Sequence, residues 1–135
     1  MTEPKAESAE SLKGKRGFRR LINATRYSWQ GIRAGLKNEA AFREECLLAV
    51  ILIPIALLLP VTLLEKVILI NSVLFLLLTE ILNSAIEAVV DRIGMEVHPL
   101  AGRAKDMGSA AVLFALIMGL VAWGFIALPA VLRLF

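Results

Sequence analysis

Three long apolar runs dominate the pattern of hydrophobic and polar positions along this chain. They cover residues 46–64, 67–90 and 109–132. Each run is close to the roughly 20 residues that an α-helix needs to cross about 30 Å of hydrocarbon. The runs are continuous and do not show the two-residue period of β-barrel strands. The pattern therefore predicts an all-α membrane protein with three transmembrane helices.

A different pattern precedes these runs, over residues 16–37. Apolar side chains recur there at intervals of three and four residues, and cations occupy the other face. This predicts an amphipathic helix that lies in the headgroup layer of the membrane. A generic membrane anchor explains the same periodicity. The apolar positions of this helix are Phe18, Leu21, Ile22, Trp29, Ile32 and Leu36.

Residues 1–15 are rich in Glu, Lys, Ser and Ala, so we expect a disordered tail followed by one domain, residues 16–135. The chain has 135 residues, of which 58% are hydrophobic. Its mean hydropathy is +0.72. These values are too apolar for a soluble domain, and the length allows one small unit.

The positive charges are sorted along the chain rather than spread over a soluble face, which argues against a nucleic-acid partner. Ten of the 15 Lys and Arg residues precede residue 46, and three lie between the second and third runs. The positive-inside rule therefore places the N-terminus and the second loop in the cytoplasm. The first loop and the C-terminus are expected on the outside.

Local signals predict where the helices begin and end. Asn38 is expected as an N-cap, with Glu39 in the first turn of the next helix, where the helix dipole favours an acid. Pro60 is expected to end the first run, and Gly94 the second. Residues 95–108 are then predicted as a loop.

Small residues in the third run favour close helix packing. Ala111, Ala115 and Gly119 follow one another at four-residue spacing, which lets another helix approach closely. Three helices make a thin bundle that cannot enclose several carboxylates and a ligand. A homo-oligomer with shared sites is therefore expected.

Carboxylates inside the second run are the candidate chemistry. Glu80, Asn83 and Glu87 lie in a segment otherwise suited to lipid, and helical spacing puts them on one face with Ser84 and Asp91. Two acids near the middle of a membrane helix cost about 5 to 7 kcal/mol, which the neighbouring apolar residues roughly offset. Acids held only by interhelical hydrogen bonds are one interpretation. Because intramembrane acids usually mark functional sites, a functional cluster is the preferred one.

The residues of this stripe resemble a known signature. The segment 80–91, Glu-Ile-Leu-Asn-Ser-Ala-Ile-Glu-Ala-Val-Val-Asp, is similar to that of the small integral-membrane diacylglycerol kinases of bacteria. Residues 38–43 and 102–109 resemble two further blocks of that family. The resemblance covers roughly residues 18–123.

The resemblance implies an ATP-dependent and Mg²⁺-dependent enzyme that phosphorylates the free hydroxyl of diacylglycerol and yields phosphatidic acid. It also implies a homotrimer with composite active sites in the bacterial inner membrane. Glu80 would be the catalytic base, and Glu39 and Glu87 would hold the metal. The implied nucleotide-binding residues are Arg20, Tyr27, Glu39, Glu87, Glu96, His98, Lys105 and Asp106. The implied lipid-binding residues are Arg20, Ala24, Thr25, Arg26, Tyr27, Ser28, Trp29, Glu80, Asn83 and Ser109.

The residue types agree with this chemistry. Magnesium prefers one or two carboxylates together with phosphate oxygens and water, and phosphoryl transfer mainly requires positioning and charge neutralisation. The sequence has neither a P-loop nor a G-x-G-x-x-G motif, so an ATP site has to be built from charges and metal. Three alternatives remain: an undecaprenol kinase of the same family, a small proton-coupled transporter, and a non-enzymatic membrane adaptor.

Overall fold

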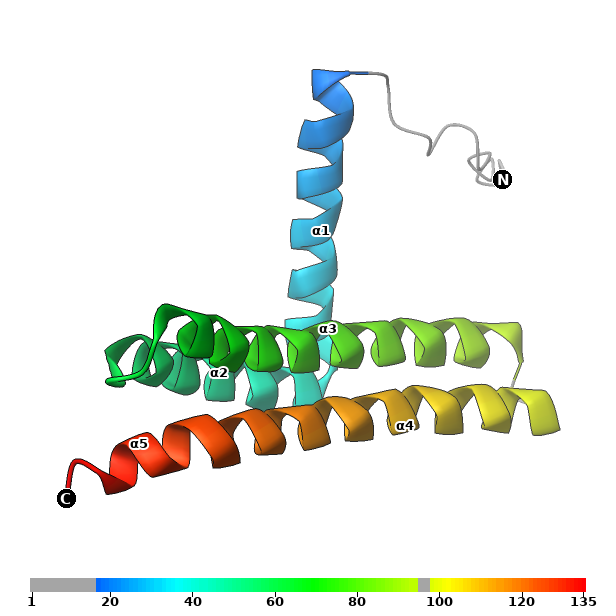
Figure 1. Cartoon of the computed structure of the whole chain (residues 1–135). Coiled ribbons are helices and arrows are strands. Elements are labelled where there is room, and N and C mark those ends of the chain that lie inside the picture. Colours follow the sequence, from blue (N-terminus) through cyan, green and yellow to red (C-terminus); the bar gives the residue numbers. More distant parts are fainter. Residues whose placement is uncertain (1–16, 95–97) are drawn as a thin grey trace, which may run out of the picture.

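The computed structural model describes residues 17–94 and 98–135, and this part of the chain is helical without any strand. The predicted tail, residues 1–15, lies outside the described residues. Figure 1 shows long helical rods side by side and a helix, residues 18–38, that projects away from them. The elements are α1 (Phe18–Asn38), α2 (Ala40–Leu58), α3 (Leu63–Ile93), α4 (Pro99–Ala122), the π-helical turn η1 (Trp123–Ala127) and α5 (Leu128–Leu132).

Helices α2, α3 and α4 form the bundle. Helix α3 packs along most of α4 and along α2, and η1 and α5 continue the rod that α4 begins (Figure 1). Helix α1 makes few contacts with α2 and α3, so most of its length stands clear of the bundle. The helix predicted over residues 16–37 is thus present as α1, while its place at the membrane surface stays a prediction.

The turn between the first two bundle helices is earlier than the apolar pattern predicts. Helix α2 ends at Leu58, and α3 begins at Leu63, so the expected bounds at residues 64 and 67 are wrong. Pro60 explains the end, because a residue before proline is driven into extended backbone, as Leu59 is. Thr62 explains the new start. Its Oγ1 accepts a hydrogen bond from the Glu65 N–H at 3.2 Å, and its own N–H donates to Glu65 Oε2 at 2.8 Å, which is a capping box.

The corner between α1 and α2 also differs from the prediction. Asn38 is the last residue of α1, and its Nδ2 donates to the Ala34 carbonyl at 3.0 Å, so its expected role as an N-cap is wrong. Glu39 is the extended residue between the two helices rather than a member of the first turn. The carboxamide of Asn38 satisfies a carbonyl of its own helix instead, and α1 ends one residue later than predicted.

Two contacts hold that corner together. Arg43 of α2 reaches back, and its Nη1 donates to the carbonyls of Leu36 at 3.0 Å and Lys37 at 3.1 Å. These are orphan carbonyls at the end of α1, which otherwise need water. Gly35 is buried, and a Cβ there would lie 2.9 Å from the ring of Phe42. The ring of Phe42 therefore packs directly on the backbone of α1.

The start of α4 is helical where a loop was expected. Residues 99–108 belong to α4, so the predicted loop over 95–108 is wrong for that segment. Pro99 occupies the first helical turn, and His98 Nδ1 accepts a hydrogen bond from the Leu100 N–H at 3.1 Å. A proline with a capping side chain before it is a strong start signal that outweighs the polarity of the segment. Gly94 does follow the last residue of α3, as predicted.

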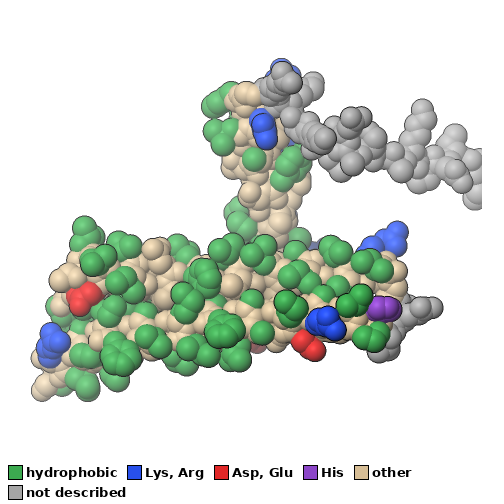
Figure 2. Space-filling view, turned by 45° about the vertical axis from the view of Figure 1, so that its right-hand side comes forward, with side chains coloured by type: hydrophobic (Ala, Val, Ile, Leu, Met, Phe, Trp, Pro, Cys, Tyr) green, Lys and Arg blue, Asp and Glu red, His purple; other side chains and the backbone are tan. Residues whose placement is uncertain are grey.

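Most large apolar side chains point outward. The buried core is small and lies at the end of the bundle next to the α2–α3 turn, where Ala56, Leu59, Leu69, Ala127 and Ala130 meet. Hydrophobic side chains cover the surface of the bundle in Figure 2. Such an apolar surface is too large for a soluble monomer and needs lipid or a partner.

Two of the helical rods are long and apolar enough to cross a membrane, Leu63–Ile93 and Pro99–Leu132. Helix α2 is shorter and carries three charged residues, 43–45, so the third span remains a prediction. The close packing predicted for Ala111, Ala115 and Gly119 is confirmed in part. Ala115 is fully buried and Gly119 half-buried, whereas Ala111 is exposed.

Candidate functional site

Glu80 is the buried acid of the bundle. It lies on α3 with 7% of its surface exposed, which makes it the sole acidic residue among the buried residues of the described chain. Glu39, Glu87 and Glu45 lie within electrostatic range of it. We call Glu39, Glu45, Glu80 and Glu87 the acidic cluster. It joins the start of α2 to the middle of α3, on the side of the bundle where α1 departs.

Glu45 belongs to this cluster, although sequence reasoning missed it. It is half-buried, and its Oε2 has no hydrogen-bond partner in the described part of the chain. A signal was present. Phe42, Ala49 and Ala56 form the buried face of α2, and position 45 falls on that face at helical spacing.

Asn83 connects α3 to α4. Its Nδ2 donates to Glu87 Oε1 at 3.3 Å, one turn further along the same helix. Its Oδ1 is buried and has no hydrogen-bond partner among the described residues. The carboxamide lies against Gly108 of α4, which is buried. Glu87 is therefore oriented by a residue that is itself packed between two helices.

Lys105 and Asp91 form an ion pair across α3 and α4. Lys105 Nζ lies 2.6 Å from Asp91 Oδ1, and 41% and 66% of the two side chains are exposed. Lys105 precedes the apolar run 109–132, and the hydrogen bond to Asp91 raises its pKa above the ordinary value for lysine. Glu87 also lies within electrostatic range of Lys105. A cation thus stands at the edge of the acidic cluster.

The predicted residues of α1 do not reach this cluster within one chain. Arg20 and residues 24–29 are exposed, and α1 carries them away from the bundle (Figure 1). Their contacts are local. Thr25 Oγ1 donates to the Leu21 carbonyl at 3.0 Å, and the Arg26 guanidinium lies 5.6 Å from the centre of the Tyr27 ring. The structure leaves the α1 residues and Glu80 apart.

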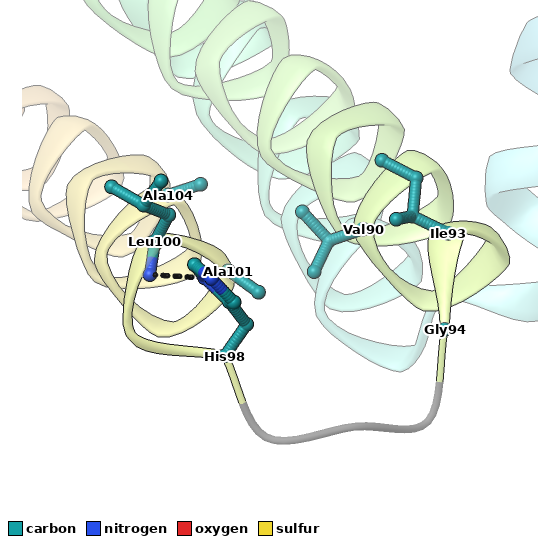
Figure 3. Close-up of a pocket in the computed structure, with 7 residues that line it drawn as sticks. All are labelled: Val90, Ile93, Gly94, His98, Leu100, Ala101 and Ala104. Atoms are coloured by element: carbon teal, nitrogen blue, oxygen red, sulfur yellow. Dashed lines mark hydrogen bonds between the residues drawn. The ribbon is translucent and has the colours of Figure 1, made fainter.

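The remaining predicted residues lie near the α3–α4 connection. Glu96 is outside the described residues. His98 lines a pocket of about 820 Å³, and in Figure 3 side chains from the end of α3 and the start of α4 face this pocket from opposite sides. Asp106 and Ser109 are exposed on α4. The pocket is lined by Val90, Ile93, Gly94, His98, Leu100, Ala101 and Ala104.

Oxygen ligands are available in the acidic cluster, but a complete metal cage is not. Within residues 17–94 and 98–135, no three His, Cys, Asp or Glu side chains converge as a metal site. A cation bound there would need ligands from another molecule, such as phosphate oxygens or water. One buried acid, three neighbouring carboxylates, an adjacent cation and an apolar outer surface define a helical membrane protein with an acidic cluster between α2 and α3.

Comparison with known proteins gives the family. Residues 26–127 match the family model described as prokaryotic diacylglycerol kinase, and the chain belongs to this family. The resemblance noted in the sequence is thereby confirmed. The chain is 56% identical to the diacylglycerol kinase of Escherichia coli (strain K12) over 107 residues, which cover 79% of this chain and 88% of the relative. It is 50% identical to the diacylglycerol kinase of Pseudomonas aeruginosa over 121 residues, which cover 90% and 98% of the two chains.

Proposed function

We propose that this protein is a lipid kinase that transfers the γ-phosphate of MgATP to the free hydroxyl of diacylglycerol and yields phosphatidic acid. The observation that carries the proposal is the buried Glu80 beside Glu39, Glu45 and Glu87, in a chain of this family. Diacylglycerol keeps its acyl chains in the bilayer and its hydroxyl near the headgroups. The acceptor therefore arrives laterally at the depth of these carboxylates.

Glu80 is the general base in this proposal. A base must lie within hydrogen-bond reach of the proton that it removes, and a carboxylate shielded from water can meet a hydroxyl presented from the lipid side. Asn83 and Ser109 then line the approach of the acceptor.

Glu39 and Glu87 are the residues that would hold Mg²⁺. They fit this ion because they supply carboxylate oxygens, which it prefers, and because Asn83 fixes one oxygen of Glu87 at 3.3 Å. When bound, the ion neutralises charge on the nucleotide phosphates. Lys105 adds a cation for the phosphate chain, and His98, Glu96 and Asp106 surround the nucleotide at the α3–α4 connection.

The residues of α1 complete the site from a second subunit of a homotrimer. The support is geometric: α1 stands away from its own bundle and carries exposed Arg20, Tyr27 and Trp29. If α3 and α4 cross the membrane, α1 leaves the bundle at a steep angle to them and therefore runs along the headgroup layer. There Arg20 and Tyr27 meet the nucleotide, and residues 24–29 line the lipid. The N-terminus and the α3–α4 connection face the bacterial cytoplasm, where ATP is present.

A phosphorylation assay on the purified protein tests the proposal. With γ-labelled ATP and diacylglycerol, Glu80→Gln should lower kcat by about 10² to 10⁴, the range expected for loss of a general base, and keep nucleotide binding. Glu39→Gln and Glu87→Gln should instead raise the Mg²⁺ concentration needed for half-maximal activity. Glu44→Gln is the matched control, because Glu44 is an exposed acid on α2. Normal turnover of Glu80→Gln, or undecaprenol as the better acceptor, would overturn the assignment.

Subunit mixing tests the shared site. Oligomers assembled from Arg20→Ala and Glu80→Gln chains should recover activity if one site takes Arg20 and Glu80 from different subunits. Mixtures that stay as inactive as either parent would show that each subunit works alone.

A further inference from the structure

Gly108 of α4 is buried and lies directly against the carboxamide of Asn83. A Cβ built on Gly108 would fall well inside van der Waals contact with Asn83 Oδ1 and 3.3 Å from Asn83 Cγ. The Cα of Asn83 is 3.8 Å away, which is ordinary contact. The space of one methyl group at position 108 is thus filled by the end of the Asn83 side chain.

The direction in which Asn83 turns its amide follows from Glu87. The amide presents Nδ2 to Glu87 Oε1, at 3.3 Å, and Oδ1 to Gly108. Oδ1 is left buried and without a partner in the described chain. A side chain at position 108 would push this oxygen and, through the planar amide, withdraw Nδ2 from Glu87.

We infer that Gly108 is a positioning residue for Glu87 and acts through Asn83. The inference rests on the proposed role of Glu87 as a ligand of the metal bound with the nucleotide. By leaving room for the carboxamide, Gly108 holds Nδ2 against Glu87 Oε1 and so sets the direction of the other carboxylate oxygen, Oε2. Partners of this kind fix the orientation of metal ligands, and their loss typically weakens metal binding 10- to 100-fold.

The competing explanation is that Gly108 serves only the close approach of α3 and α4, as small residues often do in membrane helices. One feature favours the specific role. The overlap of an added Cβ falls on the far end of a side chain and not on the backbone of α3. An alanine at position 108 should therefore displace the amide and leave the helices in place.

Helix α4 offers matched controls. Gly102 and Gly119 lie on the same helix, and a Cβ at either one would meet no described atom within 4 Å. Gly102→Ala and Gly119→Ala make the same chemical change as Gly108→Ala, with the same gain in helix propensity. They should leave metal binding as it is in the wild type.

The experiment measures metal affinity without turnover. Mn²⁺, which carboxylates also bind, is titrated by electron paramagnetic resonance into detergent-solubilised protein that is saturated with a non-hydrolysable ATP analogue. Gly108→Ala should raise the Kd for Mn²⁺ by about 10-fold or more, and Asn83→Ala should do the same. The double variant should be no weaker than Asn83→Ala alone, within about twofold, because both changes break one contact. The half-saturating Mg²⁺ in the kinase assay should rise in parallel, with a smaller change in kcat.

Three results would overturn the inference: an unchanged Kd in Gly108→Ala, equal losses in the Gly102→Ala control, or multiplicative losses in the double variant. If Gly108→Ala does not fold, Asn83→Ala decides, since it removes the hydrogen bond without adding an atom. An unchanged Kd in that variant then refutes the inference. Glu87→Gln separates the two proposals. If it leaves the Kd unchanged, the metal-ligand role proposed above for Glu87 fails, whereas a loss in Glu87→Gln with none in Gly108→Ala refutes only the role of Gly108.

Discussion

In the proposed site, the carboxylate of Asp91 competes with a nucleotide phosphate for the ammonium group of Lys105. Lys105 Nζ lies 2.6 Å from Asp91 Oδ1, so one of its donors points at a carboxylate rather than at a phosphate. Asp91→Asn removes this competitor and also one negative charge next to a strongly anionic ligand. Both effects act in the same direction, and we expect a lower KM for MgATP with kcat unchanged.

The size of the effect follows from exposure. Because 41% of Lys105 and 66% of Asp91 remain in contact with water, solvent screens the pair. Exposed ion pairs are weak in general, which limits the fall in KM to at most about fivefold. The effect should shrink further at about 1 M salt, where charges are screened beyond roughly 3 Å.

The pH dependence provides a second check. The hydrogen bond to Asp91 raises the pKa of Lys105, so the pair is intact below the ordinary lysine value and is lost as the pH rises through the raised one. The change in KM should therefore be constant between about pH 6 and pH 9.

Steady-state kinetics in mixed micelles at saturating lipid measure the effect. Asp91→Glu, which keeps the charge, is the control, and Asp91→Asn should lower KM by a smaller factor when combined with Lys105→Gln, because only the loss of the negative charge then acts. A higher KM in Asp91→Asn would refute the reasoning, because it would mean that Asp91 aims Lys105 at the phosphates instead of withholding it.

Two further substitutions test the packing of the α1–α2 corner and the N-terminal cap of α3, with stability measured by thermal unfolding in detergent. Gly35→Ala should destabilise the protein by about 1 to 3 kcal/mol, because the added Cβ would press on the Phe42 ring. Gly31→Ala in the same helix is the control, because a Cβ there would meet no described atom within 4 Å, and equal stability of the two variants would contradict the packing at the corner. Thr62→Ala should lower the free energy of unfolding by about 1 kcal/mol, because it removes the capping box at the start of α3, and Thr62→Ser should retain most of this stability. An unchanged stability of Thr62→Ala would mean that the cap contributes nothing.

The helical class and the polar face of α3 could be predicted because both follow from hydrophobicity and a 3.6-residue period. Glu80, Asn83 and Glu87 stand out as polar residues in an apolar run, and the structure places Glu80 and Glu87 in one acidic cluster. The ends of helices were less accessible. Around the α2–α3 turn the hydropathy hardly changes, so the boundary is encoded in Pro60 and Thr62 rather than in polarity.

Polarity misled the prediction in two other places. Residues 99–108 are polar and were expected as a loop, yet Pro99 and the His98 cap start a helix there. Glu45 was overlooked because an acid at the start of an apolar run resembles an ordinary solvated residue, whereas its position on the buried face of α2 decides its environment. Within one chain the α1 residues lie apart from the acidic cluster. The proposed contact with a second copy would leave no periodic signal in the sequence of a single chain.

The π-helical turn Trp123–Ala127 changes the phase of the last helical rod. A π-turn spans five residues per hydrogen bond instead of four, so it absorbs one residue and rotates everything after it by about 100° relative to an unbroken α-helix. This rotation brings Ala127 and Ala130 against Ala56 and Leu69 beside the α2–α3 turn. The extra residue thereby sets how the end of the rod meets the α2–α3 turn, independently of the register at Gly108 beside Asn83.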